Sequence, residues 1–190
     1  MTNTVCRVTP NASHASALTP FLRGVGPTLW SRLRTHRGAL SGTYEGGGNH
    51  RGSVFRERVG EALIERDGLH DDYPEWGDGS SAARELRLTE LELEQRVSEY
   101  IRDLPFLWVD VGDEPGPESD RAYVERNTIA LVSNYKSEPI DPRGDSWLGS
   151  YSPNEKIRNS GLWNINHVEE SCDPASLDRL AEAIERTDPL

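Results

Sequence analysis

Arg32 and His36 lie four residues apart in the segment TLWSRLRTHRG, and their side-chain types suit chemistry on a phosphate group. Four residues make about one turn of an α-helix, so a helix here places both side chains on one face. A guanidinium binds phosphoryl oxygens, and an imidazole can transfer a proton near neutral pH. The alternative interpretation of this spacing is a solvated, basic helix face without a catalytic role.

A carboxylate far along the chain extends this set. Glu125 stands in YVERNTIALVSN, where a helix is expected over residues 123–133. One carboxylate can hold Mg²⁺, with waters and substrate oxygens completing the octahedron. With Arg32 and His36 it would form a phosphodiesterase set, in which the metal polarises the phosphoryl oxygen, Arg32 stabilises the pentacovalent state and His36 positions or deprotonates water. The alternative for Glu125 is a favourable contact with the positive end of the helix dipole.

Asn134 follows the same predicted helix, at its carboxyl end. Its amide could orient a phosphate group or cap the helix, and the sequence leaves both roles open.

The Arg32–His36 pair lies in a basic stretch of an otherwise acidic chain. Residues 21–60 hold seven arginines and two glutamates, a net charge of +5, so the rest of the chain carries −16 within a total of −11. The stretch either faces phosphates or pairs with acidic residues of neighbouring segments. The arginines are Arg23, Arg32, Arg34, Arg37, Arg51, Arg56 and Arg58.

The segment GGGNHRGSVFR adds further candidates for nucleic-acid contact. Its three consecutive glycines, residues 46–48, allow unusual backbone angles or a close approach to a partner. The alternative is a structured loop whose Asn and His side chains satisfy backbone groups. The residues expected to contact the DNA backbone or base edges are Arg34, Arg37, Asn49, His50, Arg51 and Arg56.

Bulk composition restricts the class of protein. The chain has 190 residues, enough for one domain, and a low hydrophobic fraction of 35%. It has no apolar run that could cross a bilayer and no signal-peptide core, so we expect a cytoplasmic protein without a membrane partner. Cys6 and Cys172 lie too far apart in sequence for a zinc or disulfide motif. The net charge argues against nonspecific coating of nucleic acid.

Hydrophobic spacing and breaker residues predict the elements. Residues 1–20 are a poorly patterned arm, and residues 21–190 form one domain. The segment FLWVDV, bounded by Pro105 and Gly112, is the best strand candidate. Trp147 and Trp163 are expected to anchor a long polar stretch, and WNINH (163–167) could line a groove or supply a core tryptophan. Helices are expected over 28–36, 53–66, 81–104 and 123–133 and from Asp173 onward, the last with Leu177, Leu180 and Ile184 on its inner face.

The segment FLRGVGPTLWSRLRTHRG resembles the second half of the GIY-YIG nuclease motif, in which a tyrosine–aliphatic–glycine turn is followed by L-x-x-R-x-x-x-H. Gly24, Leu29, Arg32 and His36 fall in that register. VERNTIALVSN resembles the later helix of the family, where a glutamate binds the catalytic metal and an asparagine follows. Glu125 and Asn134 match these two positions. The run GGGNHRGSVFRERVGEAL, with SNY and GLWNINHVEE, also resembles a bacterial group of GIY-YIG proteins, so the likeness spans about residues 21–167.

The chain departs from the family pattern at its N-terminus. The family uses two tyrosines on a β-hairpin, one of which is thought to act as general base. Leu22, Arg23 and Gly24 stand at the second motif, and no tyrosine precedes Tyr44. The expectation is that the hairpin is eroded or that the chain begins too late to contain it, with His36 as a substitute base.

The resemblance implies a fold and an activity. The fold is an α/β (α+β) single domain with a small central sheet packed by helices and an incomplete N-terminal hairpin. The activity is endonucleolytic hydrolysis of DNA phosphodiester bonds with Mg²⁺ or Mn²⁺, by Arg32, His36 and Glu125. The alternatives are a catalytically inactive relative that binds DNA or a protein partner, and a domain without any nucleic-acid role.

Overall fold

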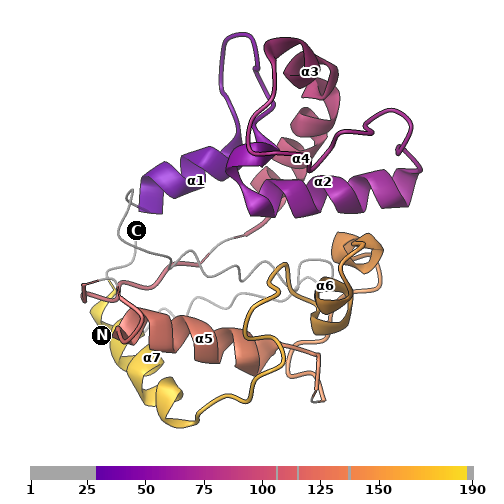
Figure 1. Ribbon diagram of the computed structural model, residues 1–190. Coiled ribbons are helices and arrows are strands. Elements are labelled where there is room, and N and C mark those ends of the chain that lie inside the picture. Colours follow the sequence, from indigo (N-terminus) through magenta and orange to yellow (C-terminus); the bar gives the residue numbers. More distant parts are fainter. Residues whose placement is uncertain (1–28, 106, 115, 137, 188–190) are drawn as a thin grey trace, which may run out of the picture.

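The computed structural model describes residues 29–105, 107–114, 116–136 and 138–187, so the expected arm and the hairpin region lie outside the described residues. The helices α1–α4 gather in one part of the molecule and α5–α7 in the other (Figure 1). The helices are α1 (Leu29–Arg37), α2 (Val54–Asp67), α3 (Arg84–Thr89), α4 (Leu91–Asp103), α5 (Asp120–Val132), α6 (Glu155–Ser160) and α7 (Ala175–Arg186), with short 3₁₀ turns η1 (His50–Gly52) and η2 (Leu148–Tyr151).

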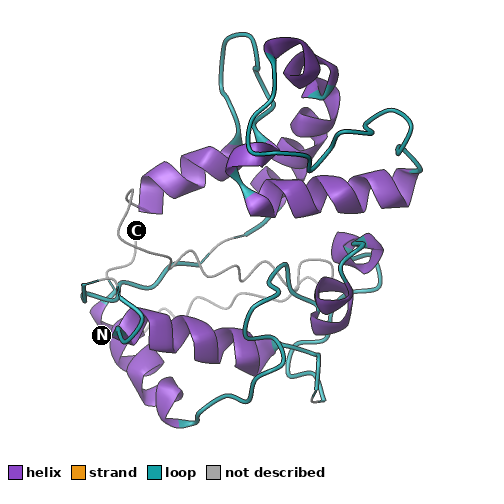
Figure 2. Ribbon diagram, in the orientation of Figure 1, coloured by secondary structure: helices purple, strands orange, loops and turns teal. Residues whose placement is uncertain are grey.

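The predicted central sheet is wrong for the part of the chain that the structure describes, which contains helices and loops but no strand (Figure 2). The FLWVDV segment is irregular from Leu107 to Val111, and Leu107 is 77% exposed. A strand needs a neighbouring strand for its backbone groups. Here the Asp110 amide instead donates to Thr187 Oγ1. Residue types favoured the extended conformation, but they could not supply a partner.

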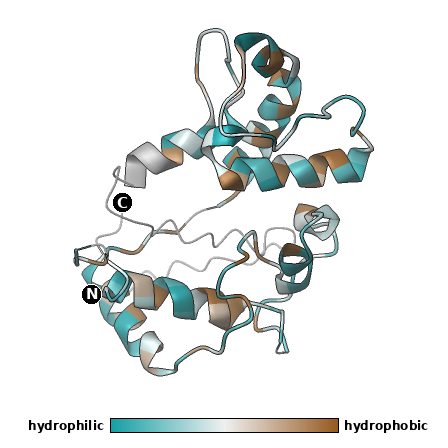
Figure 3. Cartoon of the chain, in the orientation of Figure 1, coloured by the Kyte–Doolittle hydropathy of each residue, from teal (hydrophilic) through white to brown (hydrophobic). Residues whose placement is uncertain are grey.

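Local signals in the sequence set both ends of α2. The Ser53 side chain accepts a hydrogen bond from the Arg56 amide, as expected of an N-cap, and Gly68 ends the helix in the left-handed conformation. Hydrophobic and hydrophilic residues alternate along the helix (Figure 3). Its apolar stripe is buried at Val59, Ala62 and Leu63, but Val54 is exposed.

The single helix expected over 81–104 is two helices, α3 and α4, that meet at Glu90. Glu90 lies between the two helices, as the C-cap of α3 and the N-cap of α4. Its side chain is buried, and its carboxylate binds Arg51. On α4, Leu93 and Val97 are fully buried.

The predicted inner face of the last helix is wrong at two of its three positions. Leu177 and Ile184 are exposed, whereas Ser176 and Ala183 are buried. Small side chains face the neighbour because α7 packs closely against α5. The helix was expected to begin from Asp173, but it begins at Ala175 with Pro174 as its N-cap, and the Asp173 carboxylate accepts from the Ala175 amide.

One hydrophobic core joins the two parts of the molecule. Its buried residues come from α2, α4, η2, α6 and the segment around Trp163, and both Trp147 and Trp163 are buried as predicted. A smaller cluster packs Ile129 of α5 against Leu162 and Val168. None of the helices described has the length and apolarity to cross a membrane. The cytoplasmic location expected from composition stays a prediction.

Candidate active site

His36 lies near the carboxyl end of α1 and is held by the first turn of α2. Its Nδ1 lies 2.8 Å from Ser53 Oγ, and its ring meets the ring of Phe55 edge-on at a centroid distance of 5.7 Å. Arg56 fixes the backbone at the same point, because its Nη1 donates to the His36 carbonyl oxygen at 2.6 Å. Arg32 lies one turn earlier in α1, so the helical spacing of the pair is as predicted.

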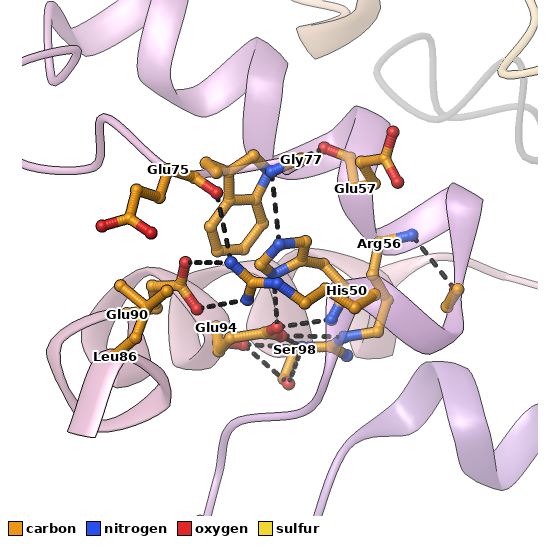
Figure 4. A network of polar contacts seen from close by, with 12 residues as sticks. His50, Arg56, Glu57, Glu75, Gly77, Leu86, Glu90, Glu94 and Ser98 are labelled. Atoms are coloured by element: carbon orange, nitrogen blue, oxygen red, sulfur yellow. Dashed lines mark hydrogen bonds and ion pairs between the residues drawn. The ribbon is translucent and has the colours of Figure 1, made fainter. Parts of the chain in front are cut away.

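Arg56 is the centre of a buried polar network (Figure 4). The side chain is fully buried, and its Nε donates to Glu94 Oε2 at 3.0 Å. Its Nη2 donates to the Ser98 hydroxyl at 3.0 Å and to the Glu94 carbonyl at 2.8 Å. A buried guanidinium is tolerated only when it is paired and hydrogen-bonded, and Glu94 provides that pairing.

His50 occupies the other oxygen of the same carboxylate. The His50 amide and Nδ1 lie 2.6 and 3.0 Å from Glu94 Oε1. Its Nε2 accepts from the Gly77 amide, so Nδ1 carries the proton and donates to Glu94. The imidazole also stacks on Trp76 at a centroid distance of 3.8 Å.

The ionisation of Glu94 reflects these contacts. Burial acts to raise the pKa of the Glu94 carboxyl, but the hydrogen bonds from His50 and the charge and hydrogen bonds of Arg56 outweigh burial and lower it. The carboxylate is therefore stabilised in its charged form inside the protein.

Arg51 forms a second ion pair beside this network. Its Nη1 and Nη2 bind the two carboxylate oxygens of Glu90 at 2.6 and 2.8 Å, which is bidentate geometry. Its remaining donors bind the carbonyl oxygens of Glu75 and Asp78. The side chains of Arg51 and Glu90 are 1% and 5% exposed, so this arginine fastens the 75–78 loop to α4.

The structure thus divides the residues that were expected to contact nucleic acid. The side chains of His50, Arg51 and Arg56 are used inside the protein, which matches the alternative of intramolecular pairing. Arg34 and Asn49 are exposed. The remaining member, Arg37, is half-buried, and its carbonyl oxygen accepts from Arg102 Nε.

The glycines before His50 have a packing role in this network. A Cβ atom on Gly48 would lie 2.3 Å from Arg56 Cζ, and one on Gly47 would lie 2.6 Å from Leu91 Cδ1. The close approach that the glycines were expected to allow is therefore an approach to the protein's own Arg56.

Glu125 is the sixth residue of α5, because the helix begins at Asp120, three residues earlier than expected. The dipole effect falls off within the first turn, so the dipole explanation for Glu125 loses support. Among the described residues there is no cluster of three or more His, Cys, Asp or Glu suited to a metal. Glu125 is half-buried, and a Mg²⁺ site with this one carboxylate stays a prediction.

Asn134 connects the end of α5 to α6 rather than capping α5. Its backbone amide and its Nδ2 both donate to the Ser160 carbonyl oxygen, at 2.8 and 3.0 Å. The side chain packs beneath Gly161, where a Cβ atom would lie 2.4 Å from Nδ2. This contact positions the segment that continues to Trp163.

The segment 160–168 links α5 to the part of the site around His36. Ser133, just after α5, donates its hydroxyl to the Val168 carbonyl oxygen at 2.7 Å. The Trp163 ring meets that of Phe55 at 6.1 Å, and Phe55 contacts His36. Trp163 of the WNINH motif thus contacts Phe55, the neighbour of His36, whereas α1 with Arg32 and His36 and α5 with Glu125 lie in different parts of the molecule (Figure 1).

Two residues near the site, Ser53 and Arg58, were not predicted from the sequence to take part in it. The predicted helix over 53–66 began at Ser53, but nothing in the sequence showed that its hydroxyl also meets His36. Arg58 was one arginine of the basic stretch, and the structure shows its Nη1 donating to the Trp163 carbonyl oxygen at 3.0 Å.

Comparison with known proteins identifies the family of the chain. The sequence profile of the GIY-YIG domain matches residues 4–190. The chain belongs to the GIY-YIG domain family. No curated protein and no solved structure matches the chain. Membership of a family of nuclease domains confirms the resemblance seen in the sequence, and the GIY-YIG positions Arg32 and His36 share one helix while Glu125 lies on another.

Proposed function

We propose that this GIY-YIG domain is a metal-dependent endonuclease that hydrolyses phosphodiester bonds of DNA. The observation that carries the proposal is His36, whose ring is fixed by Ser53 and Phe55 and whose backbone is fixed by Arg56. A group that transfers a proton must be held in position, and three neighbouring contacts in a helix–helix junction do this. Family membership and the helical spacing of Arg32 and His36 support the same activity.

The 2.8 Å contact with Ser53 fits either tautomer of His36, and the proposal takes the one with the proton on Nδ1. Ser53 Oγ accepts from the Arg56 amide and retains a second lone pair for the proton on His36 Nδ1. His36 Nε2 is then the nitrogen that accepts a proton from the attacking water. Arg32 binds the phosphoryl oxygens and stabilises the charge that develops on them.

Glu125 holds the metal ion in this proposal. Mg²⁺ or Mn²⁺ bound there would polarise a phosphoryl oxygen and offset the charge on the leaving group. The carboxylate of Glu125 contributes the protein ligand, and its helix keeps that ligand in place.

DNA is the substrate proposed from the family. Arg34 and Asn49 are exposed and stand near His36 in the chain or on the following loop, so we assign them contacts to the DNA backbone. Arg37 has the same assignment. His50, Arg51 and Arg56 receive a structural role instead, because their side chains are buried in contacts with Glu94 and Glu90.

The dependence of the nicking rate on pH tests the role of His36. Under single-turnover conditions, the rate of the parent protein should rise with pH as the imidazole loses its proton and then level off. His36→Gln keeps polar atoms but cannot accept the proton, so its rate should be far lower and lack that rise. A rate that keeps the same pH dependence in His36→Gln would contradict the proposed role. DNA binding without nicking by the parent would favour the inactive relative.

A further inference from the structure

Arg58 differs from its neighbours on α2 in its pairing. Arg56 is paired with Glu94, and Arg66 with Asp67. The guanidinium of Arg58 has no carboxylate within salt-bridge distance among the described residues, although the side chain is half-buried. A cation that has lost part of its water without gaining a counter-ion is a site of attraction for an anion.

The donors of Arg58 are largely unused in the described structure. The guanidinium has five N–H donors, and the one hydrogen bond to a described residue runs from Nη1 to the Trp163 carbonyl oxygen. This bond fixes the orientation of the planar group. Burial lowers the pKa of Arg58, and the more distant carboxylates of Glu61 and Glu57 act against this effect.

Arg58 lies beside the His36 site. Phe55, one turn earlier on α2, contacts the ring of His36 on one side and the ring of Trp163 on the other. Arg58 bonds to Trp163 on the same side of the helix. It stands five residues after Ser53, the partner of His36, which is about 7.5 Å along the helix axis.

The side chain of Arg58 suits a nucleic-acid backbone. The planar donor pattern of arginine matches phosphate oxygens and allows bidentate binding.

We propose that Arg58 binds a DNA backbone phosphate near the one that is hydrolysed at Arg32 and His36, and thereby sets the position of the strand. This inference rests on the proposed function for its choice of ligand. It assigns to one arginine of α2 a role that neither Arg56 nor Arg66 can fill, since each is engaged with a carboxylate.

The test measures duplex DNA binding by fluorescence anisotropy over a range of salt concentrations, with Ca²⁺ in place of Mg²⁺. Arg58→Gln should weaken binding about tenfold and reduce the salt slope by about one phosphate contact. Arg66→Gln, the matched control on the same helix, should keep the parent affinity and slope. Arg58→Lys should recover part of the affinity, because it keeps the charge. Arg58→Gln with parent affinity and slope would overturn the proposal.

A second measurement separates a phosphate contact from a structural effect. Duplexes with a single neutral methylphosphonate at successive positions should weaken binding of the parent at a defined position. Arg58→Gln should be insensitive to the methylphosphonate at that one position and remain sensitive at the others. Equal sensitivity of both proteins at every position would overturn the proposal. Thermal unfolding identifies a variant that is misfolded, in which case Arg58→Met, which keeps the aliphatic stem, replaces it.

These outcomes separate the inference from the proposed function. Arg58-dependent binding without any nicking by the parent would support the phosphate contact and reject hydrolysis. Nicking by the parent with binding that does not depend on Arg58 would reject the contact alone. A parent protein that does not bind DNA would overturn both.

Discussion

At the scale of single residues, the position of the His36 ring depends on Ser53 and Phe55, which belong to another helix and to no motif shared with His36. The Arg32–His36 spacing predicted a helix with both residues, and α1 contains both. The sequence could not predict Ser53 or Phe55 as partners of His36, because contacts between two helices depend on how the helices cross. Periodicity describes one helix at a time.

Replacing Ser53 tests its double role as N-cap and partner of His36. Ser53→Ala should cost about 1 kcal/mol of unfolding free energy, because α2 loses its cap. It should also lower the nicking rate at least tenfold, since the His36 ring loses the group that orients it. Thermal unfolding and plasmid nicking measure the two effects.

Two controls accompany this variant. Ser53→Thr keeps the hydroxyl and should retain most of both properties. Asn154→Ala removes the comparable N-cap of α6 and should lower stability without lowering the nicking rate. Loss of activity in Asn154→Ala to the same extent would show that stability alone explains the result.

Glu94 is the residue on which the buried network depends. Its folded-state pKa is lowered from the ordinary 4.5, so the charged carboxylate stabilises the protein above that pH. This stability is lost as the pH falls below 4.5 and through the folded-state value. The melting temperature of the parent should therefore decline as the pH is lowered in that range.

Glu94→Gln should remove this contribution. The variant leaves Arg56 buried without a counter-ion, so we expect a loss of about 3 kcal/mol at neutral pH and a weaker decline in acid. Glu92→Gln, an exposed position on the same helix, should behave like the parent. Parent-like stability of Glu94→Gln at neutral pH would contradict the account of the network.

At the scale of elements, the sequence predicted a helix best where capping residues lie at its ends. The ends of α2 follow from Ser53 and Gly68, whereas α7 begins at Ala175, two residues after the predicted start at Asp173. The predictions from the sequence were wrong where an element's conformation or buried face depends on the element packed beside it. The FLWVDV segment has no strand beside it in the described chain, and α7 turns small side chains to α5 because only these allow close packing.

The glycine-rich segment before α2 gives a test at this scale. Gly48→Ala should destabilise the protein by a few kcal/mol, because its Cβ atom would lie 2.3 Å from the buried Arg56 guanidinium carbon. Gly52→Ala should be tolerated, since the nearest atom lies 4.0 Å from its Cβ position. Urea unfolding of the two variants measures the difference. Equal stability would show that the Gly48 backbone moves freely and does not support Arg56.

At the scale of the whole molecule, the main core is built from α2, α4, η2, α6 and the segment around Trp163. Trp163 lies in that core, packs against Phe55 near His36 and belongs to the segment that is bonded to the end of α5. Glu125 and His36 thus lie on separate helices that share a connecting segment. The two halves of the GIY-YIG resemblance were recognisable in the sequence, but this connection was not, because it joins residues far apart in the chain.

Part of the positive charge of the basic stretch is used inside the protein. The basic stretch from 21 to 60 lies in a chain with a net charge of −11. Its members Arg51 and Arg56 neutralise buried carboxylates, so fewer arginines remain for DNA than a count suggests. The affinity for DNA should therefore depend on a few arginines, among them Arg34 and Arg58.

The most direct test of the proposed activity is nicking of supercoiled plasmid with Mg²⁺ or Mn²⁺ by the parent, Arg32→Ala and Glu125→Ala. Matched controls are Arg186→Ala and Glu182→Ala, two exposed positions on α7. We expect metal-dependent nicking by the parent and both controls, and a loss of at least a hundredfold in Arg32→Ala and Glu125→Ala. Equal nicking by all five proteins, or no nicking by the parent with either metal, would contradict the assignment of this site.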